Sequence, residues 1–210
     1  MCYSAEAWTL YQNYVDEFGA DIDIEEFWKT YLERDEKYRI RTPGRAAPKI
    51  PKGMDLSFLN PRTDREREIR ALIDAADQQK ISDSEQELFK QVKRLADAER
   101  KLAVKETKTA LNEQRIAGNK IKQLKRWIAD AKRKTMEPAK DNRIFPDWYV
   151  PVLIVENGRK VVRPMRYHCR PAGMDPSIDK TKDGRVSGTY NARRDNLSAS
   201  GAINSATRTV

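Results

Sequence analysis

The chain has 210 residues, of which 35% are charged and 39% are hydrophobic, and its formal net charge at pH 7 is +9. This length and polarity predict one folded domain with a solvent-rich extension, and a basic balance favours a polyanion such as nucleic acid as partner. No apolar run approaches the length of a membrane span, and the start lacks the apolar core of a secretory leader. We therefore expect a cytoplasmic protein without membrane contacts, associated with the nucleoid if it is bacterial.

The chain has two cysteines, Cys2 and Cys169, and a single histidine, His168. A structural disulfide is not expected in a reducing cytosol, and a zinc site needs four ligands in paired spacing. We therefore expect neither a metal nor another cofactor. His168 and Cys169 are neighbours in the sequence, and in a strand their side chains would point to opposite faces, so they do not make a Cys–His catalytic pair by themselves.

Residues 4–18 predict a first helix. Ser4 can cap it, and apolar residues follow at helical spacing as far as Phe18. Gly19 is the residue type that commonly ends a helix. The next helix is predicted to begin after Asp23, which can act as its N-cap. It carries an apolar face for which core packing is favoured over base stacking, made of Phe27, Trp28, Tyr31 and Leu32.

Residues 41–61 are rich in proline and predict an irregular connector. The segment from about 64 to 134 is different, because it is dense in charge and has no proline. It predicts a short helix over 64–79 and a long helix from Ser82, where Ser82 and Glu85 have capping-box spacing. A heptad-like seam runs through Leu88, Val92, Leu95 and Leu102 and resumes at Ile121, Leu124 and Ile128. One straight helix would span about 75 Å, so a break is predicted at Gly118–Asn119.

A β-type apolar run over 148–155 is followed by an Asn157-Gly158 pair and a second strand-like run over 160–163. This pattern predicts a β-hairpin. Pro164 limits how far the second strand can continue as a central one. Residues 188–197 have the composition of an ordered, specific segment. Residues 198–210 are small and polar without apolar periodicity, and they predict a disordered tail.

Cys2 would carry a distinctive chemistry if Met1 were removed, because it would then offer an α-amine and a thiol on one residue. The reference pKa values of these groups are about 7.7–8.0 and 8.5, so both are partly reactive near neutrality. An aldehyde can condense with the amine to a Schiff base, and the thiolate can then close a thiazolidine ring. Elsewhere, Asn191 and Arg193 would share one face of an extended segment, where Arg193 could clamp a phosphate.

The Met1-Cys2 start, together with Gly188-Thr189-Tyr190-Asn191-Ala192-Arg193, resembles the SOS-response-associated peptidase family of abasic-site processing proteins. Residues 144–173 resemble the strands that precede this motif in the family. The resemblance covers the N-terminal tip and roughly residues 141–197, and the helical arm is not part of the usual fold. It implies an α+β protein: a partial strand-rich domain with a long helical, coiled-coil-like insertion.

The resemblance also implies a function. The protein would take part in the response to DNA damage, and Cys2 would bond covalently to abasic sites in single-stranded DNA after peptidase-like self-removal of Met1. Asn191 would orient the cysteine or the opened sugar, and Arg193 would hold a phosphate, with Arg166 and Arg170 as further DNA contacts. The family's downstream glutamate and histidine have no counterpart here. We therefore expect a truncated member with uncertain hydrolase- or lyase-like activity.

The expected organisation is an N-terminal part of the family-like domain in 1–60, a helical arm in 61–137, the strand part in 138–197 and a tail in 198–210. Two alternatives remain open. One is a non-enzymatic, basic coiled-coil adaptor that binds nucleic acid, a protein partner or a second copy of itself through the arm. The other is an inactive family fragment. The adaptor needs the arm and not Cys2, whereas the family function needs the reverse.

Overall fold

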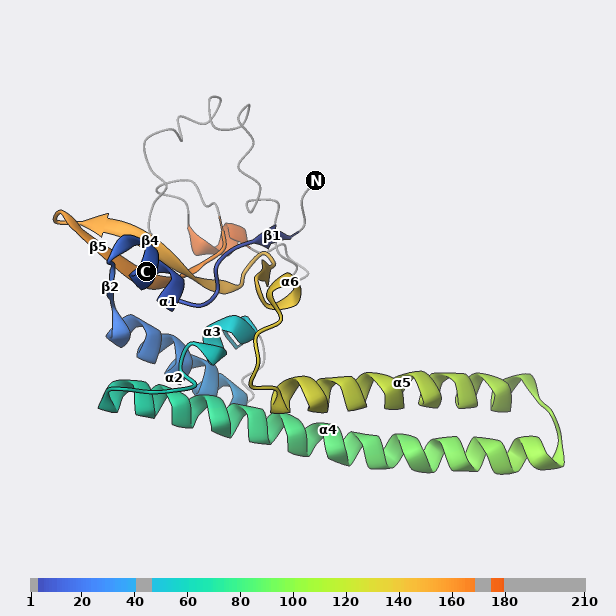
Figure 1. Ribbon diagram of the computed structural model, residues 1–210. Helices are drawn as coiled ribbons and strands as arrows, with labels where there is room; N and C mark the ends of the chain where they lie inside the picture. The colour runs from blue at the N-terminus through green and yellow to red at the C-terminus, as the bar shows by residue number, and fades with distance from the viewer. Residues whose placement is uncertain (1–3, 41–46, 169–174, 180–210) are drawn as a thin grey trace, which may run out of the picture. The chain divides into compact units, whose positions relative to one another are not determined.

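The computed structural model describes residues 4–40, 47–168 and 175–179, and at residues 37–40, 176 and 179 it describes the backbone only. Helices and strands are both present, so the α+β class predicted from the sequence is confirmed (Figure 1). The chain divides into two compact units, residues 1–72 together with 135–210, and residues 73–134. The two units are described separately below.

The first unit contains short strands and short helices around one longer hairpin. In chain order, its elements are β1 (Ala5–Glu6), α1 (Gln12–Phe18), β2 (Asp21–Ile22), α2 (Ile24–Ile40), α3 (Lys52–Leu56), the start of α4 (Asp64–Val104), α6 (Pro138–Asp141), β3 (Arg143–Ile144), β4 (Tyr149–Glu156), β5 (Arg159–Arg166) and the 3₁₀ turn η1 (Pro176–Asp179). The second unit holds the rest of α4 and α5 (Lys108–Lys132).

The predicted helix over residues 4–18 is wrong in its first half. Residues 5–6 form strand β1, which pairs antiparallel with β3, and the helix begins only at Gln12. The N–H of Ala7 donates to the carbonyl of Asn142 at 2.9 Å, a partner that lies far away in the sequence. A backbone group satisfied in this way cannot also join a helical ladder, which explains the late start. The helix ends as predicted at Gly19, with φ of 59°.

The predicted hairpin is confirmed. Strands β4 and β5 pair antiparallel along their whole length, and the pair Glu156↔Arg159 closes the turn. Asn157 and Gly158 both have positive φ, 51° and 77°, as a two-residue type I′ turn requires. The twist of such a turn matches that of the strands, so the local sequence alone fixes the register.

Strand β5 is the central strand of a three-stranded sheet of order β2-β5-β4, and β2 runs parallel to it. The β2 pairing involves only Val161 and Val162 of β5. Two residues further on, Pro164 has no N–H to offer a longer β2 strand, and it faces Pro151 of β4. Pro164 thus limits the sheet as the sequence predicts.

An aromatic cluster forms the core of the first unit. Phe27 and Tyr31 of α2 are fully buried, so the predicted core role of this helix face is confirmed for them. Phe58 contacts both rings, and the ring of Tyr11 contacts Phe27 and Phe58. Burial, and after it the neighbouring Asp55 carboxylate, keeps the pKa of Tyr31 well above its usual range.

A buried ion pair lies beside this core. Arg34 of α2 donates from Nη1 to Oδ1 of Asp55 in α3 at 3.0 Å, and both side chains are about nine-tenths buried. The same guanidinium lies 4.7 Å from the centre of the Tyr31 ring. Removing one partner of such a pair would strand a buried charge, so this contact constrains how α3 packs on α2.

Helix α4 starts at a capping box that the sequence analysis did not single out. The Thr63 side chain accepts the N–H of Glu66 at 3.2 Å, and the Glu66 carboxylate accepts the N–H of Thr63 at 3.0 Å. Helix α4 then continues through Ser82 without interruption, so the predicted helix start at Ser82 is wrong. No proline or glycine occurs between 79 and 82 to stop the helix there.

The break between the two arm helices lies at residues 105–107 and not at Gly118–Asn119, which is inside α5. Thr107 has an extended backbone, so the chain does not continue there as one helix. Its side-chain hydroxyl caps α5 by accepting the N–H of Ala110 at 3.2 Å. Val92 is 49% exposed and does not belong to the buried seam. Among the described residues, no helix is both long and apolar enough to cross a membrane.

Candidate functional site

The N-terminal strand is the described segment nearest in sequence to Cys2, and it is tied to residues 142–144. Ala5 pairs with Ile144, and Glu6 pairs with Arg143. Thr9 is fully buried, and both its N–H and its hydroxyl donate to Oδ1 of Asn142, at 3.4 and 3.1 Å. Backbone and side-chain bonds to one short segment therefore fix where the N-terminal strand lies.

Gly53 of α3 allows this arrangement. A Cβ atom at Gly53 would lie 1.9 Å from Oγ1 and 2.8 Å from Cβ of Thr9. Such distances are far below van der Waals contact, so any larger residue would push Thr9 and the strand away from their observed positions. Glycine is needed here for close approach, and its φ is not in the left-handed region.

The open end of the β4–β5 hairpin follows directly after β3. Asp147 has a φ of 72°, and its N–H donates to the carbonyl of Tyr167 at 3.0 Å. Arg166 donates from Nη1 to Oδ1 of Asp147 at 3.2 Å, and its side chain is 25% exposed. Arg166, predicted from the sequence to contact DNA, thus has a carboxylate neighbour, and its DNA contact stays a prediction.

A surface aromatic group, which we call the Trp8 cluster, comprises Trp8, Tyr14 and Phe18. The Trp8 ring lies 5.6 Å from Tyr14 and 6.2 Å from Phe18, and Trp8 and Phe18 are 43% and 39% exposed. Lys160 of β5 lies 5.9 Å from the Phe18 ring and donates to the Phe18 carbonyl at 3.2 Å. Exposed rings beside a cation are a surface on which a base can stack.

The sequence analysis did not find this cluster. It placed Tyr14 and Phe18 in the apolar stripe of a longer helix, and it gave Trp8 no role. Helix α1 buries none of its residues. The only signal for this cluster in the sequence was an aromatic residue, Trp8, close to Cys2.

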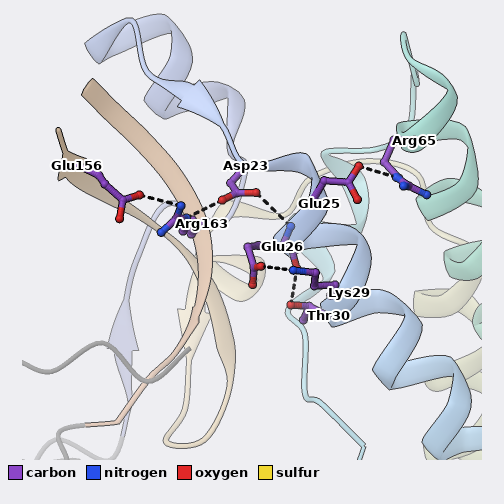
Figure 2. Close-up of polar contacts among 8 residues, drawn as sticks. All are labelled: Asp23, Glu25, Glu26, Lys29, Thr30, Arg65, Glu156 and Arg163. Carbon is purple, nitrogen blue, oxygen red and sulfur yellow. Dashed lines mark hydrogen bonds and ion pairs between the residues drawn. The ribbon is translucent and has the colours of Figure 1, made fainter. Parts of the chain in front are cut away.

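A polar network joins α2 to β5, as Figure 2 shows. Arg163 donates from Nε to Oδ2 of Asp23 at 2.6 Å, and its Nη2 lies 2.8 Å from Oε2 of Glu156. The hydrogen bond to Asp23 is the main reason that the pKa of Arg163 is raised. Asp23 also accepts the N–H of Glu26 at 3.3 Å, so the predicted cap of this helix is confirmed. The network positions the hairpin and holds its charges in pairs.

Four of the predicted site residues, Cys2, Asn191, Arg193 and Arg170, lie outside the described residues, so the structure does not bring them together or separate them. Cys169 and the predicted tail over 198–210 lie outside as well. Within the described ranges, no group of three or more histidine, cysteine, aspartate or glutamate side chains is arranged to hold a metal ion.

Comparisons of this chain with protein-family models, with curated proteins and with solved structures found no match. The family resemblance carried by Cys2 and the Asn-Ala-Arg motif therefore stays a prediction, and so does the function that it implies.

Proposed function

We propose that this protein binds single-stranded DNA and forms a covalent thiazolidine between Cys2 and an abasic site, as the SOS-response-associated peptidase family does, after removing its own Met1. The observation that carries the proposal is the combination of Cys2 with Asn191-Ala192-Arg193 in one basic chain. Asn191 orients the reacting groups, and Arg193, Arg166 and Arg170 contact phosphates. The reaction needs no cofactor.

The chemistry balances with one water as the only product besides the adduct. The Cys2 amine attacks the C1′ aldehyde of the ring-opened deoxyribose, and loss of water gives an imine. The Cys2 sulfur then adds to the imine carbon while its proton passes to the nitrogen, which closes the five-membered ring. Only an N-terminal cysteine can do this, so removal of Met1 must come first.

The anchored N-terminal strand supports this proposal. Cys2 precedes strand β1 by three residues in the sequence, and β1 is held by its pairing with β3. Ile144 leads within three residues to Asp147, the partner of Arg166. An ordered strand next in sequence to the reactive residue, in a unit that also carries the exposed rings of Trp8 and Phe18, suits a protein that binds a strand of DNA.

The proposal is tested by whether a covalent adduct forms on abasic DNA and depends on Cys2. The test is a denaturing gel of the protein incubated with single-stranded oligonucleotides with and without an abasic site. The shifted band should appear only with the abasic strand, persist in Cys169→Ala and vanish in Cys2→Ala. A band that survives Cys2→Ala, or one of equal strength on undamaged DNA, rejects the proposal.

A second candidate function is that of an adaptor acting through the arm, without covalent chemistry. The specific observation in its favour is that two apolar residues on successive turns of α4, Phe89 and Val92, are 74% and 49% exposed. Exposed apolar side chains on a solvated helix favour a protein partner or a second copy. Phe89→Ser with Val92→Ser should then abolish binding of the protein partner or self-association of the chain, either of which sedimentation measures. The yield of any Cys2 adduct should not change.

A further inference from the structure

The two arm helices run in opposite directions (Figure 1), and ion pairs between them mark two chemically different sides. In α5 the buried residues recur every seven positions, at Ala110, Ala117, Leu124 and Ala131. In α4, Ile81, Ser84 and Ala98 are buried at positions that fit a 3-4 heptad spacing. These buried residues define the seam, the line along which the two helices face each other. Every other residue of the arm can then be placed on one flank of the seam or the other.

Two ion pairs between the helices mark these flanks. Glu85 pairs with Lys132 at 3.5 Å, and Arg94 pairs with Glu113. Glu85 and Arg94 are nine residues apart, which is about half a turn at 100° per residue, so they lie on opposite sides of the seam. We call the side that carries Arg94 and Glu113 the Arg94 side.

A cleft of about 480 Å³ opens on the Arg94 side, close to the 105–107 turn. Four cationic side chains line it, together with two carboxylates, small residues and threonines; the charged ones are Lys90, Lys93, Arg94, Lys101, Asp97 and Glu113. Alanines at the seam, Ala98 and Ala110, form part of its floor, and their short side chains leave this space open. The cleft belongs wholly to the second unit.

Both carboxylates of the cleft already have cationic partners. Asp97 pairs with Arg100 at 2.5 Å, and Glu113 pairs with Arg94, whose hydrogen bond lowers the pKa of Glu113. Lys93 and Lys101 bring further positive charge to the cleft, and Lys101 also helps to lower the pKa of Glu113. Such a cleft attracts an anion with several oxygens, because each oxygen can accept from a separate ammonium group.

The positive charge of the chain is concentrated in the half of the arm that holds this cleft, both at the cleft and beyond it on α5. Residues 93–126, the half of the arm nearest the turn, hold eleven lysines and arginines against four aspartates and glutamates. This net charge of +7 is most of the +9 of the whole chain. A field of this kind favours an extended polyanion over a single small anion.

An exposed tryptophan lies on the same side. Trp127 is 43% exposed, and Lys120 lies over its ring at 5.1 Å from the centroid. Glu113, Lys120 and Trp127 follow one another at intervals of seven residues, so they occupy one flank of α5. Cations followed by an exposed ring along one track match what single-stranded nucleic acid requires, phosphate contacts and a base-stacking platform.

We propose that the Arg94 side of the arm binds the phosphate backbone of single-stranded DNA, with phosphates in the cleft between Lys93 and Lys101 and a base on Trp127. The arm is thus a second DNA-binding surface that acts without Cys2. Only the choice of DNA as the polymer rests on the function proposed above. An acidic protein surface is the rival occupant, and it predicts no binding of DNA by the arm.

The test uses the full chain and an undamaged, fluorescently labelled single-stranded oligonucleotide, with anisotropy measured over a range of salt concentrations. Lys93→Glu with Lys101→Glu should raise Kd by about tenfold or more and flatten the slope of log K against log salt by about 0.7 for each phosphate that the variant no longer neutralises. The matched control is Lys122→Glu with Lys125→Glu, which makes the same change of charge on α5 away from the cleft and should raise Kd by less than about threefold.

Circular dichroism establishes that both variants keep their helices, and Trp127→Ala should weaken binding without changing the salt slope. Equally weakened binding in the two charge variants would overturn the proposal, because net charge and not the cleft would then bind the DNA. So would unchanged binding in the cleft variant. The Cys2 adduct is measured separately at saturating abasic DNA, so failure of the covalent function leaves this result interpretable.

Discussion

Asp23 and Arg163 join helix α2 to strand β5 through a 2.6 Å contact between Oδ2 and Nε, while the other oxygen of the same carboxylate caps the helix (Figure 2). One side chain therefore serves the start of a helix and the centre of a sheet. The arrangement explains why a three-stranded sheet with a two-residue edge strand can hold its orientation against α2.

These two roles of Asp23 can be separated. Asp23→Asn keeps an oxygen that can accept the Glu26 N–H but removes the charge that faces Arg163, whereas Asp23→Ala removes both interactions. We expect Asp23→Ala to be the more destabilising by about 1 kcal/mol, the usual value of an N-cap. Urea unfolding followed by tryptophan fluorescence measures the difference. Equal destabilisation in the two variants would mean that the cap contributes nothing.

Glu66 gives the fold a dependence on pH. Its burial alone would raise the pKa of this carboxyl, but the N–H groups of Arg62 and Thr63 and the Tyr11 hydroxyl hydrogen-bond to it and lower the pKa overall. A carboxyl with a lowered folded pKa contributes stability that is present above its unfolded pKa of about 4.3 and is lost as the pH falls through the folded value.

The free energy of unfolding should therefore fall between about pH 5 and pH 3 more steeply in the native protein than in Glu66→Gln. At neutral pH, Glu66→Gln should cost about 0.5–2 kcal/mol, because one capping acceptor is weakened. Denaturant titrations at a series of pH values give both quantities. Parallel pH profiles for the two proteins would show that Glu66 does not carry the linkage.

Two glycines predict opposite outcomes for the same substitution. Gly53→Ala places a Cβ 1.9 Å from Oγ1 of Thr9. It should therefore lower the free energy of unfolding by about 3 kcal/mol or more and loosen the N-terminal strand. Gly118→Ala meets nothing within 4 Å in helix α5 and should stabilise the protein by about 0.5–1 kcal/mol. Thermal unfolding compares the two. A neutral Gly53→Ala would contradict the close approach of α3 to Thr9.

The parts of the fold that could be predicted from the sequence are those fixed by neighbouring residues. The Asn157-Gly158 turn sets the hairpin register locally, and Asp23 caps the helix that begins at the next residue. Strand β1 could not be predicted, because its partners at 142–144 lie far along the chain and the spacing of residues 4–18 is equally that of a helix.

The arm shows a different limit. Ser82-x-x-Glu85 and Thr63-x-x-Glu66 have the same capping-box spacing, and only the structure shows that the second one starts the helix. Val92 looked like a seam residue because it is apolar, but Gln91 occupies the seam position and Val92 is exposed. Of the predicted site residues, Arg166 alone lies in the described ranges, where its partner Asp147 was not anticipated.

The arm should be dispensable for the covalent chemistry. Deletion from residue 64 would remove Glu66 and the buried Ile69 of the first unit, so the cut belongs inside the second unit. The ion pair between Asp74 and Lys134 at 3.6 Å brings the ends of the arm together, and a short Gly-Ser linker can replace residues 77–131.

At saturating abasic DNA, this deletion should give the same yield of adduct as the full chain, measured on a denaturing gel. At limiting DNA and physiological salt its yield should fall, because the positive charge of the arm is gone. Absence of the adduct at saturation, in a deletion protein that still unfolds cooperatively, would mean that the arm helps to build the reactive site.

The central claim is that Cys2 reacts as an N-terminal residue with an abasic sugar, and intact-mass measurement tests it most directly. The purified protein should lack Met1. Incubation with a single-stranded abasic oligonucleotide should then give one new species, whose mass is that of protein plus oligonucleotide minus one water. Cys2→Ala should give no such species, and Cys169→Ala should give it in full. A protein that keeps Met1 quantitatively, or an adduct of this mass in Cys2→Ala, would contradict this claim.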